Sequence, residues 1–141
     1  MAEYTAVAQQ IVEPNQVVLF TDVAVRGNNS IMHREGSGLV TLRGLTCSQP
    51  RARFRVSFGA NIALPTDGTA GPISVAIAID GEPVISTKMI VTPADVEEFF
   101  NINRDVNIDV PAGCCVQVSV ENTSGDDILV ENANLIVERV A

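Results

Sequence analysis

The residues best suited to chemistry in this chain are its three cysteines, two of which are adjacent at Cys114 and Cys115. Adjacent side chains in a strand point to opposite faces, so this pair cannot jointly grip one metal ion. A tetrahedral zinc site would need two further ligands, and only Cys47 and the single His33 remain, outside any short metal-binding spacing. We therefore expect no metal or cofactor and predict that the thiols are buried structural side chains.

A catalytic cysteine and histidine pair would require His33 to approach a thiol and to be oriented by a carboxylate or an amide. Nothing in the spacing supports that arrangement, so we interpret His33 as a turn or strand-end residue, and the chain as no enzyme. A disulfide from Cys47 to either Cys114 or Cys115 stays open. An odd number of cysteines is more typical of a chain made in a reducing compartment.

Two acidic groups of residues could bind calcium in loops. One comprises Asp95, Glu97 and Glu98, and the other comprises Asp126 and Asp127. Neither follows the D-x-D-x-D-G order of a dedicated calcium loop. We interpret both as solvated loop charge, and the sequence leaves calcium binding in these loops open.

The elements that must position these residues are strands, because apolar residues recur with a period of two. Residues 73–79, "ISVAIAI", place four large side chains on one face and small ones on the other. Asp80 and Gly81 then suit a two-residue turn with positive φ, and "EPVISTKMIV" is predicted to return as the second strand of a hairpin. The same alternation in "RARFRVSF" and "VNIDV" indicates half-buried antiparallel strands.

Further strands are predicted at five other places, which gives eight to ten short strands in all. These five ranges are Thr5 to Val12, Val17 to Phe20, Leu39 to Leu45, Val116 to Glu121 and Asn134 to Val140. Only "TPADVEEFF", from Thr92, has helical features, and one turn is the most we expect there. Many short strands between turn clusters, with no repeat or linker, predict a single all-β domain over residues 1–141, an antiparallel sandwich or jelly roll.

Composition limits the function. The chain has 141 residues, 46% of them hydrophobic and 18% charged, and a net charge of −8. That charge would repel a phosphate backbone, so we expect no nucleic-acid partner, and no apolar run is long enough for a membrane helix. The N-terminal segment carries Glu3 and interrupting polar residues, so no Sec-type signal is visible and we expect synthesis in the cytoplasm.

In order, the segments "IMHREGSGLVTLRG", "RARFRVSFGANI", "VAIAIDGEPVISTKMI", "VNIDVPAGCCVQVSVENTS" and "NANLIVERVA" resemble the C-terminal domains of collagen-like exosporium glycoproteins. Those domains belong to the tumour necrosis factor and complement globular-head superfamily of jelly rolls. The resemblance covers about residues 4–141, with Gly113 at the turn glycine and Cys114 where the family has a polar residue. It implies a ten-strand TNF-like jelly roll, a compact homotrimer and a surface or structural role without catalysis.

The chain departs from that family in lacking a collagen-like G-X-Y stalk. A jelly roll of this kind without a signal peptide suits a bacteriophage virion component or a bacterial protein assembled on a spore or cell surface. The alternative is a soluble carbohydrate-binding jelly roll, against which the absence of Trp and the single Tyr argue. A jelly-roll enzyme of the cupin kind would need several histidines around a metal.

The resemblance also implies which face assembles. In the superfamily the sheet with the first, third, sixth and last strands faces the three-fold axis, which corresponds here to Thr5 to Val12, Arg51 to Phe58, Val106 to Val110 and Asn134 to Val140. The side chains opposite the core are then expected at the trimer interface, namely Arg53, Arg55, Asn107, Asp109, Ile136 and Glu138. We expect arginine and carboxylate pairing near the axis, because bidentate guanidinium geometry favours arginine there.

Overall fold

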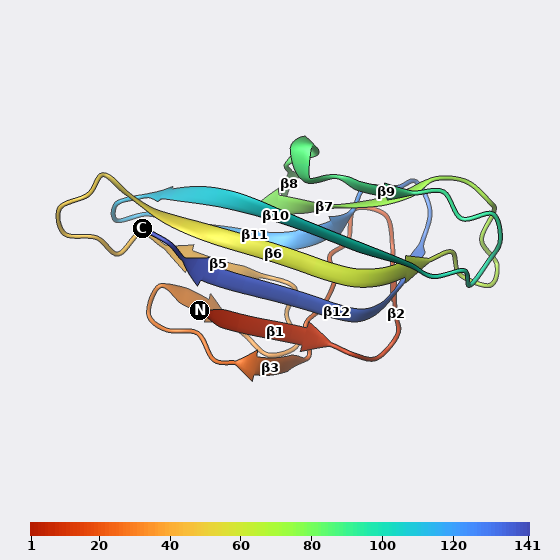
Figure 1. Ribbon diagram of the computed structural model, residues 1–141, viewed down its shortest axis with the longest axis horizontal. Coiled ribbons are helices and arrows are strands. Elements are labelled where there is room, and N and C mark those ends of the chain that lie inside the picture. Colours follow the sequence, from red (N-terminus) through yellow and green to blue (C-terminus); the bar gives the residue numbers. More distant parts are fainter.

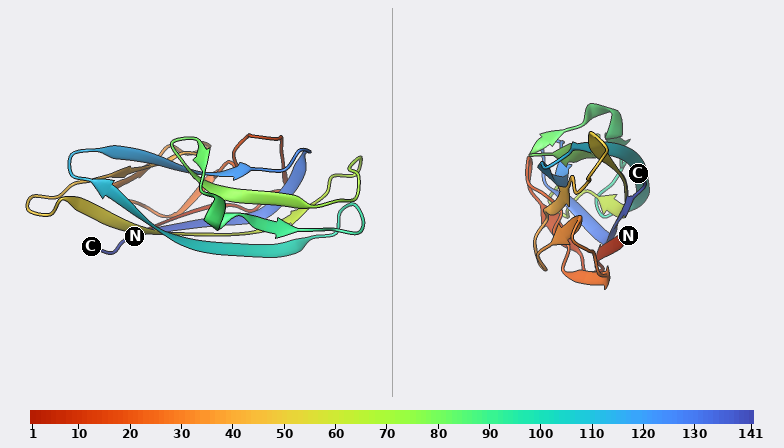
Figure 2. Two further views of the ribbon diagram at one scale, coloured as in Figure 1. Left: turned by 90° about the horizontal axis from the view of Figure 1, so that it is seen from above. Right: turned by 90° about the vertical axis from the view of Figure 1, so that its left-hand side faces the viewer.

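The computed structural model describes all residues from Met1 to Ala141 and consists of twelve β-strands in two antiparallel sheets. The sheets pack face to face as a sandwich (Figures 1 and 2). The fold class predicted from the sequence is confirmed, with more strands than the eight to ten expected. No helix of the chain is long and apolar enough to cross a membrane.

The first sheet contains the chain termini and the longest strands. Its order is β10, β6, β12, β1 and β3, and β2 also pairs with β12. The strands are β1 (Ala2–Ala6), β2 (Gln10–Val12), β3 (Asp22–Val25), β6 (Arg51–Ala63), β10 (Phe100–Pro111) and β12 (Ile128–Arg139). The four segments that the resemblance assigned to one sheet therefore do share a sheet.

The second sheet is built from shorter strands in the order β4, β5, β11, β7 and β8, and β9 also pairs with β7. These strands are β4 (Ile31–His33), β5 (Val40–Arg43), β7 (Ile73–Ile79), β8 (Glu82–Pro83), β9 (Met89–Val91) and β11 (Cys115–Asn122). In Figure 1 this sheet lies behind the first one.

The core lies between the sheets and contains a connected cluster of 30 buried hydrophobic residues. Alternation explains which side chains enter it, because Phe54, Val56 and Phe58 of β6 are at most 1% exposed whereas the alternate residues Arg53 and Arg55 are exposed. Strand β7 has the predicted face of large side chains and face of small ones, and both faces are buried, with Ile79 alone half-buried. The sequence of a strand that is buried on both faces is typically an almost continuous run of apolar residues.

The turn at Asp80 and Gly81 has φ of 53° and 84°, the positive values of the predicted two-residue turn. The returning strand was predicted as continuous, and this is wrong. It divides into β8 and β9 around a short 3-10 turn, η1 (Ile85–Thr87). The buried Thr87 hydroxyl accepts a hydrogen bond from Ile77 N–H at 2.9 Å, so a side chain takes the place of the backbone partner there.

The predicted strand from Thr5 to Val12 also divides, because β12 carries a bulge. Asn132 in that bulge has φ of 55°, and the β12 register shifts between Glu131 and Asn134. β1 pairs with β12 on one side of the bulge and β2 on the other. A bulge adds an unpaired residue and bends the strand, so the pairing with the neighbouring strand is broken at that point.

One other predicted strand is absent. Residues 17–20 form no strand, and their only ladder contact is an isolated bridge between Val17 and Glu121. The segment from Thr92 forms bends and a turn and no helix, within the limit of one helical turn that the sequence predicts. Glu97 there has φ of 56°, and its N–H donates to Leu64 O at 2.9 Å. The short strands β3 and β4 were missed, since four and three residues are too few for a periodic signal.

Candidate self-association face

The side of the first sheet that points away from the core is called the outer face here. It carries all six residues predicted at a trimer interface, which come from β6, β10 and β12. Arg55 lies directly between Asn107 of β10 and Glu138 of β12 in the strand register, and Arg53 pairs with Asp109. Ile136 lies opposite Ser57. The sheet thus brings the six residues onto one surface, which faces the viewer in Figure 1.

Arg53 and Asp109 form a two-pronged ion pair. Nε of Arg53 donates to Oδ1 of Asp109 at 2.8 Å, and Nη2 donates to Oδ2 at 3.2 Å. Arg51 Nε lies 3.7 Å from Oδ2 of the same carboxylate. The hydrogen bond from Arg53 is the main reason why the pKa of Asp109 is lowered. The fork geometry expected for arginine is therefore present within one chain.

Arg55 has a different partner, which the sequence reasoning missed. Its Nη2 donates to Oδ2 of Asp105 at 2.7 Å, and this bond, followed by one from Ser57, lowers the pKa of Asp105. The predicted strand began only at Val106, whereas β10 starts at Phe100. Asp105, Asn107 and Asp109 are spaced two residues apart, so they lie on the same face of the strand. That spacing in the sequence could have predicted Asp105 on the face that carries Arg55.

The centre of the outer face is made of small or half-buried residues. Ser57 and Gly59 of β6 lie beside Ile136 and Asn134 of β12. Nδ2 of Asn134 donates to Oε2 of Glu3 at 2.6 Å, which provides a hydrogen-bond partner for the carboxylate of β1. The outer face therefore has a centre of small or half-buried residues and, toward one end, a group of arginine and aspartate pairs.

The three cysteines contradict the prediction of buried structural thiols. Cys47, Cys114 and Cys115 are all exposed and unpaired. Cys114 belongs to the turn between β10 and β11, and Cys115 begins β11 near the end of the sandwich, where the core no longer covers the strand. The prediction failed because a strand pattern does not show how far the partner sheet extends.

His33 ends β4, as expected for a strand-end histidine. Its Nε2 lies 2.8 Å from Ser37 O, so this nitrogen donates, and Nδ1 is buried without a partner. The ring packs on Tyr4, with ring centroids 4.3 Å apart. No cysteine lies in this group, and the imidazole is used in packing.

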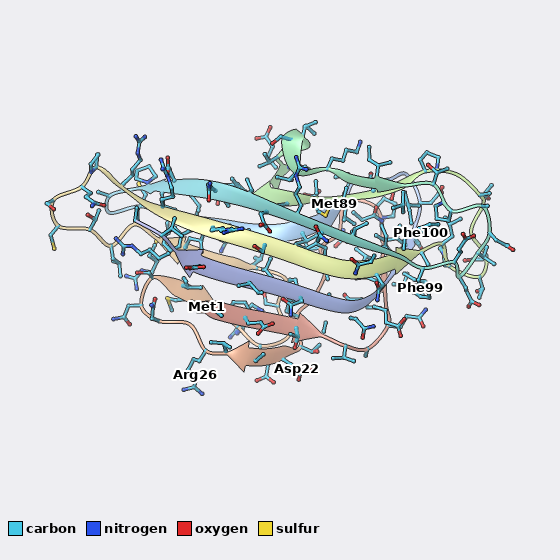
Figure 3. All side chains as sticks on the ribbon, in the orientation of Figure 1. Met1, Asp22, Arg26, Met89, Phe99 and Phe100 are labelled. Carbon is cyan, nitrogen blue, oxygen red and sulfur yellow. The ribbon has the colours of Figure 1, made fainter.

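A cleft of about 580 Å³ opens beside His33, between the edge strands β3 and β4. Tyr4 contributes to its wall, and burial raises the pKa of this phenol. Arg26 belongs to the rim, and its side chain points away from the body of the sandwich (Figure 3). The polar side chains that line the cleft do not gather around one point as the groups of a catalytic centre do.

The acidic loop residues lie at the far end of the sandwich. Asp126 and Asp127 line a polar hollow with Asp67, whereas Asp95, Glu97 and Glu98 occupy the loop between β9 and β10. No three His, Cys, Asp or Glu side chains gather closely enough to hold a metal ion. Calcium binding by these loops stays an untested possibility of the sequence.

Comparison with known proteins gives similarity in structure but not in sequence. No protein-family model and no curated protein sequence matches the chain. The globular domain of zebrafish complement 1qA protein superposes with a TM-score of 0.55 and 12% identity, covering 96% of this chain and 94% of that one. The PRD1 vertex protein P5 superposes with a TM-score of 0.51 and 8% identity, covering 99% and 96%.

A third solved structure, the C-terminal domain of the sugar-binding protein EclA, covers 94% of this chain and 80% of its own, with 15% identity and a TM-score of 0.40. The first two matches extend over nearly the whole of both chains. The chain therefore has the jelly-roll fold of the complement C1q and TNF-like domains, and the fold that the sequence resemblance implied is confirmed.

Proposed function

We propose that this chain is a non-enzymatic structural module that assembles as a compact homotrimer through its outer face and serves on the surface of a virion or of a bacterial spore or cell. The observation that carries this proposal is the outer face itself. Its arginines are already paired with carboxylates of the same chain, and its centre consists of small or half-buried residues. Such a face can approach copies of itself without bringing unpaired arginine charges together.

The energetics favour this arrangement over isolated charges. Burying an unpaired charge at an interface costs several kcal/mol, whereas a charge that keeps its partner loses far less. Arg53 and Arg55 each bring a partner, and exposed pairs of this kind contribute little to the stability of a single chain. Their pairing therefore matters more for association than for folding.

The fold is compatible with a place on a particle surface. A jelly roll similar over 99% of this chain forms the PRD1 vertex protein P5, which supports a virion component as one form of the proposal. A bacterial spore or cell surface is the other form. The neighbouring genes distinguish the two forms. Capsid, portal and tail genes nearby would indicate a virion protein, whereas spore-coat genes nearby would indicate a spore protein.

The test of assembly is light scattering on the wild-type chain and on Arg55→Glu. We expect a trimer for the wild type and dissociation in the variant, since the new carboxylate would stand between Asp105 and Glu138 in each copy. Arg34→Glu is the matched control, because Arg34 is exposed in a loop and makes no side-chain ion pair. A wild-type monomer, or an Arg55→Glu trimer, would refute this mode of assembly.

Carbohydrate binding is the rival function. Sugar rings are usually held against exposed aromatic faces, but the chain has no Trp and its one tyrosine, Tyr4, is 2% exposed. Phe99, at 38% exposure, is the most exposed aromatic residue. A glycan array without hits would retire this function, and a specific hit abolished by Phe99→Ala would favour it.

A further inference from the structure

The cleft beside His33 lies on the side of the sandwich where both sheets end. β3 is the last strand of the first sheet, and β4 is the last strand of the second sheet. The segment of residues 26–30 joins these two strands, and Arg26, Gly27 and Asn28 of that segment line the cleft. Its volume of about 580 Å³ is in the range that small organic molecules occupy in proteins.

The walls of the cleft are apolar. Val23 and Ala24 of β3 line it on one side, and Ile31 and Met32 of β4 line it on the other. Ile31 is 1% exposed and belongs to the core, whereas Val23 and Met32 are 41% and 50% exposed. An apolar group that enters between these walls would remove both exposed side chains from water, which is favourable.

Tyr4 contributes a polar atom to the cleft that the fold itself does not use. The residue is 2% exposed, its ring packs on His33, and burial alone raises the pKa of the phenol. Its hydroxyl makes no hydrogen bond to the rest of the chain. Since nearly all buried polar groups have a partner, an unpaired hydroxyl at a cleft indicates a place for a ligand group. The raised pKa keeps the hydroxyl protonated, so it can donate.

Gly27 brings the connecting segment directly against this hydroxyl. A Cβ on Gly27 would lie 3.0 Å from Tyr4 Oη and 2.3 Å from Ile31 O. Only glycine therefore lets the backbone pass this close to the tyrosine. The residues on either side of Gly27 consequently begin next to the Tyr4 hydroxyl.

Those two flanking residues are both hydrogen-bond donors without a partner. The side-chain oxygen of Asn28 accepts from Ser30 N–H at 2.8 Å, which leaves the Nδ2 group to donate elsewhere. Arg26 belongs to none of the ion pairs of the chain, and its side chain extends freely from the edge of the sandwich in Figure 3. The cleft thus has a donor end, formed by Tyr4, Arg26 and Asn28, beside apolar walls.

We propose that this cleft binds a small monocarboxylate with an aliphatic or aromatic body. The carboxylate accepts hydrogen bonds from the Tyr4 hydroxyl and Asn28 Nδ2, and the guanidinium of Arg26 supplies the positive charge at the rim. The apolar body lies between β3 and β4. Glu35 lines the cleft from the turn after β4, so a second carboxylate on the ligand would meet a like charge there.

The site is separate from the proposed self-association face. The residues of that face lie on β6, β10 and β12, whereas β3 is separated from β12 by β1 in the sheet order. Binding in the cleft can therefore be tested whether the chain is a monomer or a trimer, and either proposal can fail without the other.

The experiment is a titration of the isotopically labelled full chain, followed through backbone amide signals, with sodium hexanoate as the probe. Hexanoate should shift the signals of Gly27, Asn28 and Ile31. Hexan-1-ol and hexylammonium have the same apolar body without the negative charge, and adipate has a second carboxylate. All three should bind more weakly than hexanoate, because each lacks the single negative charge that the donor end and Glu35 together select.

Two variants test the donor end. Tyr4→Phe removes only the hydroxyl and should weaken hexanoate by about fivefold, the effect of one hydrogen bond. Its melting temperature should not fall, because the hydroxyl has no partner in the fold. Arg26→Gln should weaken hexanoate by about threefold while leaving hexan-1-ol unchanged, since only the charged probe senses the guanidinium.

Lys88→Gln is the matched control, because it also removes one positive charge but lies beside β9 on the other side of the sandwich. It should leave hexanoate binding unchanged. Equal binding of hexan-1-ol and hexanoate would show a merely apolar cleft and would overturn the proposal. So would hexanoate binding that survives both Tyr4→Phe and Arg26→Gln, or an absence of shifts at residues 27–31.

Discussion

Glu121 is the one acidic residue that the fold buries. It is 8% exposed, and burial raises its pKa above the ordinary value of 4.5. Asn122, the next residue, is fully buried but well satisfied, since Nδ2 donates to Val12 O and to Asp126 O at 2.9 Å each. The contrast shows that burial is costly for a charge without a hydrogen-bond partner and acceptable for a bonded amide.

The first prediction concerns the pH dependence caused by Glu121. Because its folded pKa is raised, the folded state binds more protons than the unfolded state just above pH 4.5, and the free energy of unfolding falls as the pH rises through that window. Glu121→Gln should raise the free energy of unfolding at pH 7 and flatten this dependence. Urea unfolding at several pH values measures it, and Glu98→Gln, at an exposed loop position, serves as the control.

Below that window the sign reverses, because Asp105 and Asp109 have lowered pKa values through their arginine partners. Their contribution is present above pH 3.8 and is lost as the pH falls through the folded pKa. Both aspartates are exposed, so solvent screening keeps this contribution small.

Turns and interruptions determine where individual strands of this protein begin and end. Asp80 and Gly81 fix the start of the β7–β8 hairpin, and the bulge at Asn132 decides where β1 ends and β2 begins. Thr87 then closes the gap between β8 and β9 by bonding the backbone of β7. Local turn chemistry therefore determines the lengths of elements that alternation alone predicts as continuous.

The second prediction tests the hairpin turn. Gly81 has φ of 84°, and a Cβ there would meet nothing within 4 Å, so Gly81→Val has a conformational cost without a steric one. We expect a loss of about 1 kcal/mol or more in the free energy of unfolding. Gly125→Val is the matched control, because its surroundings are also open and it has no positive φ. Equal melting temperatures for the two variants would contradict the assignment.

At the scale of the whole molecule, three surfaces are separated in space. The outer face of the first sheet carries arginine and aspartate pairs, the end formed by the β5–β6 loop and the β10–β11 turn carries the exposed cysteines, and the opposite end carries acidic loops. Antiparallel pairing causes this separation, since successive turns alternate between the two ends of the sandwich while the faces stay with their sheets.

The third prediction probes the outer face without reversing any charge pair. Gly59 lies at its centre, and a Cβ there would have only ordinary contacts, the nearest being Ile102 O at 3.8 Å. Gly59→Lys should therefore leave the fold of one chain intact, as circular dichroism would show, but should prevent close approach of copies. Light scattering is expected to give a monomer. Gly125→Lys, in the loop at the acidic end, should remain trimeric, and a trimeric Gly59→Lys would contradict the interface.

Much of the fold was predictable because it depends on alternation and turn chemistry. The period of two in residues 51–58 and 106–110, and the Asp80-Gly81 turn, define strands and a hairpin in the sequence itself. The ordered segments of the family resemblance supplied the jelly-roll connections, and the six predicted interface residues do share one face. These features are local or repeat along a strand, so the sequence determined them.

The tertiary structure alone decided which groups meet and which stay exposed. Asp105 as the partner of Arg55, the exposure of Cys115 and the burial of Glu121 all depend on register and on where the opposing sheet ends. Those quantities arise from pairing residues that are about 50 positions apart in the chain, as for Arg55 and Asp105. No pattern along a single strand encodes such distances, because strand side chains alternate in the same way whether or not another sheet covers them.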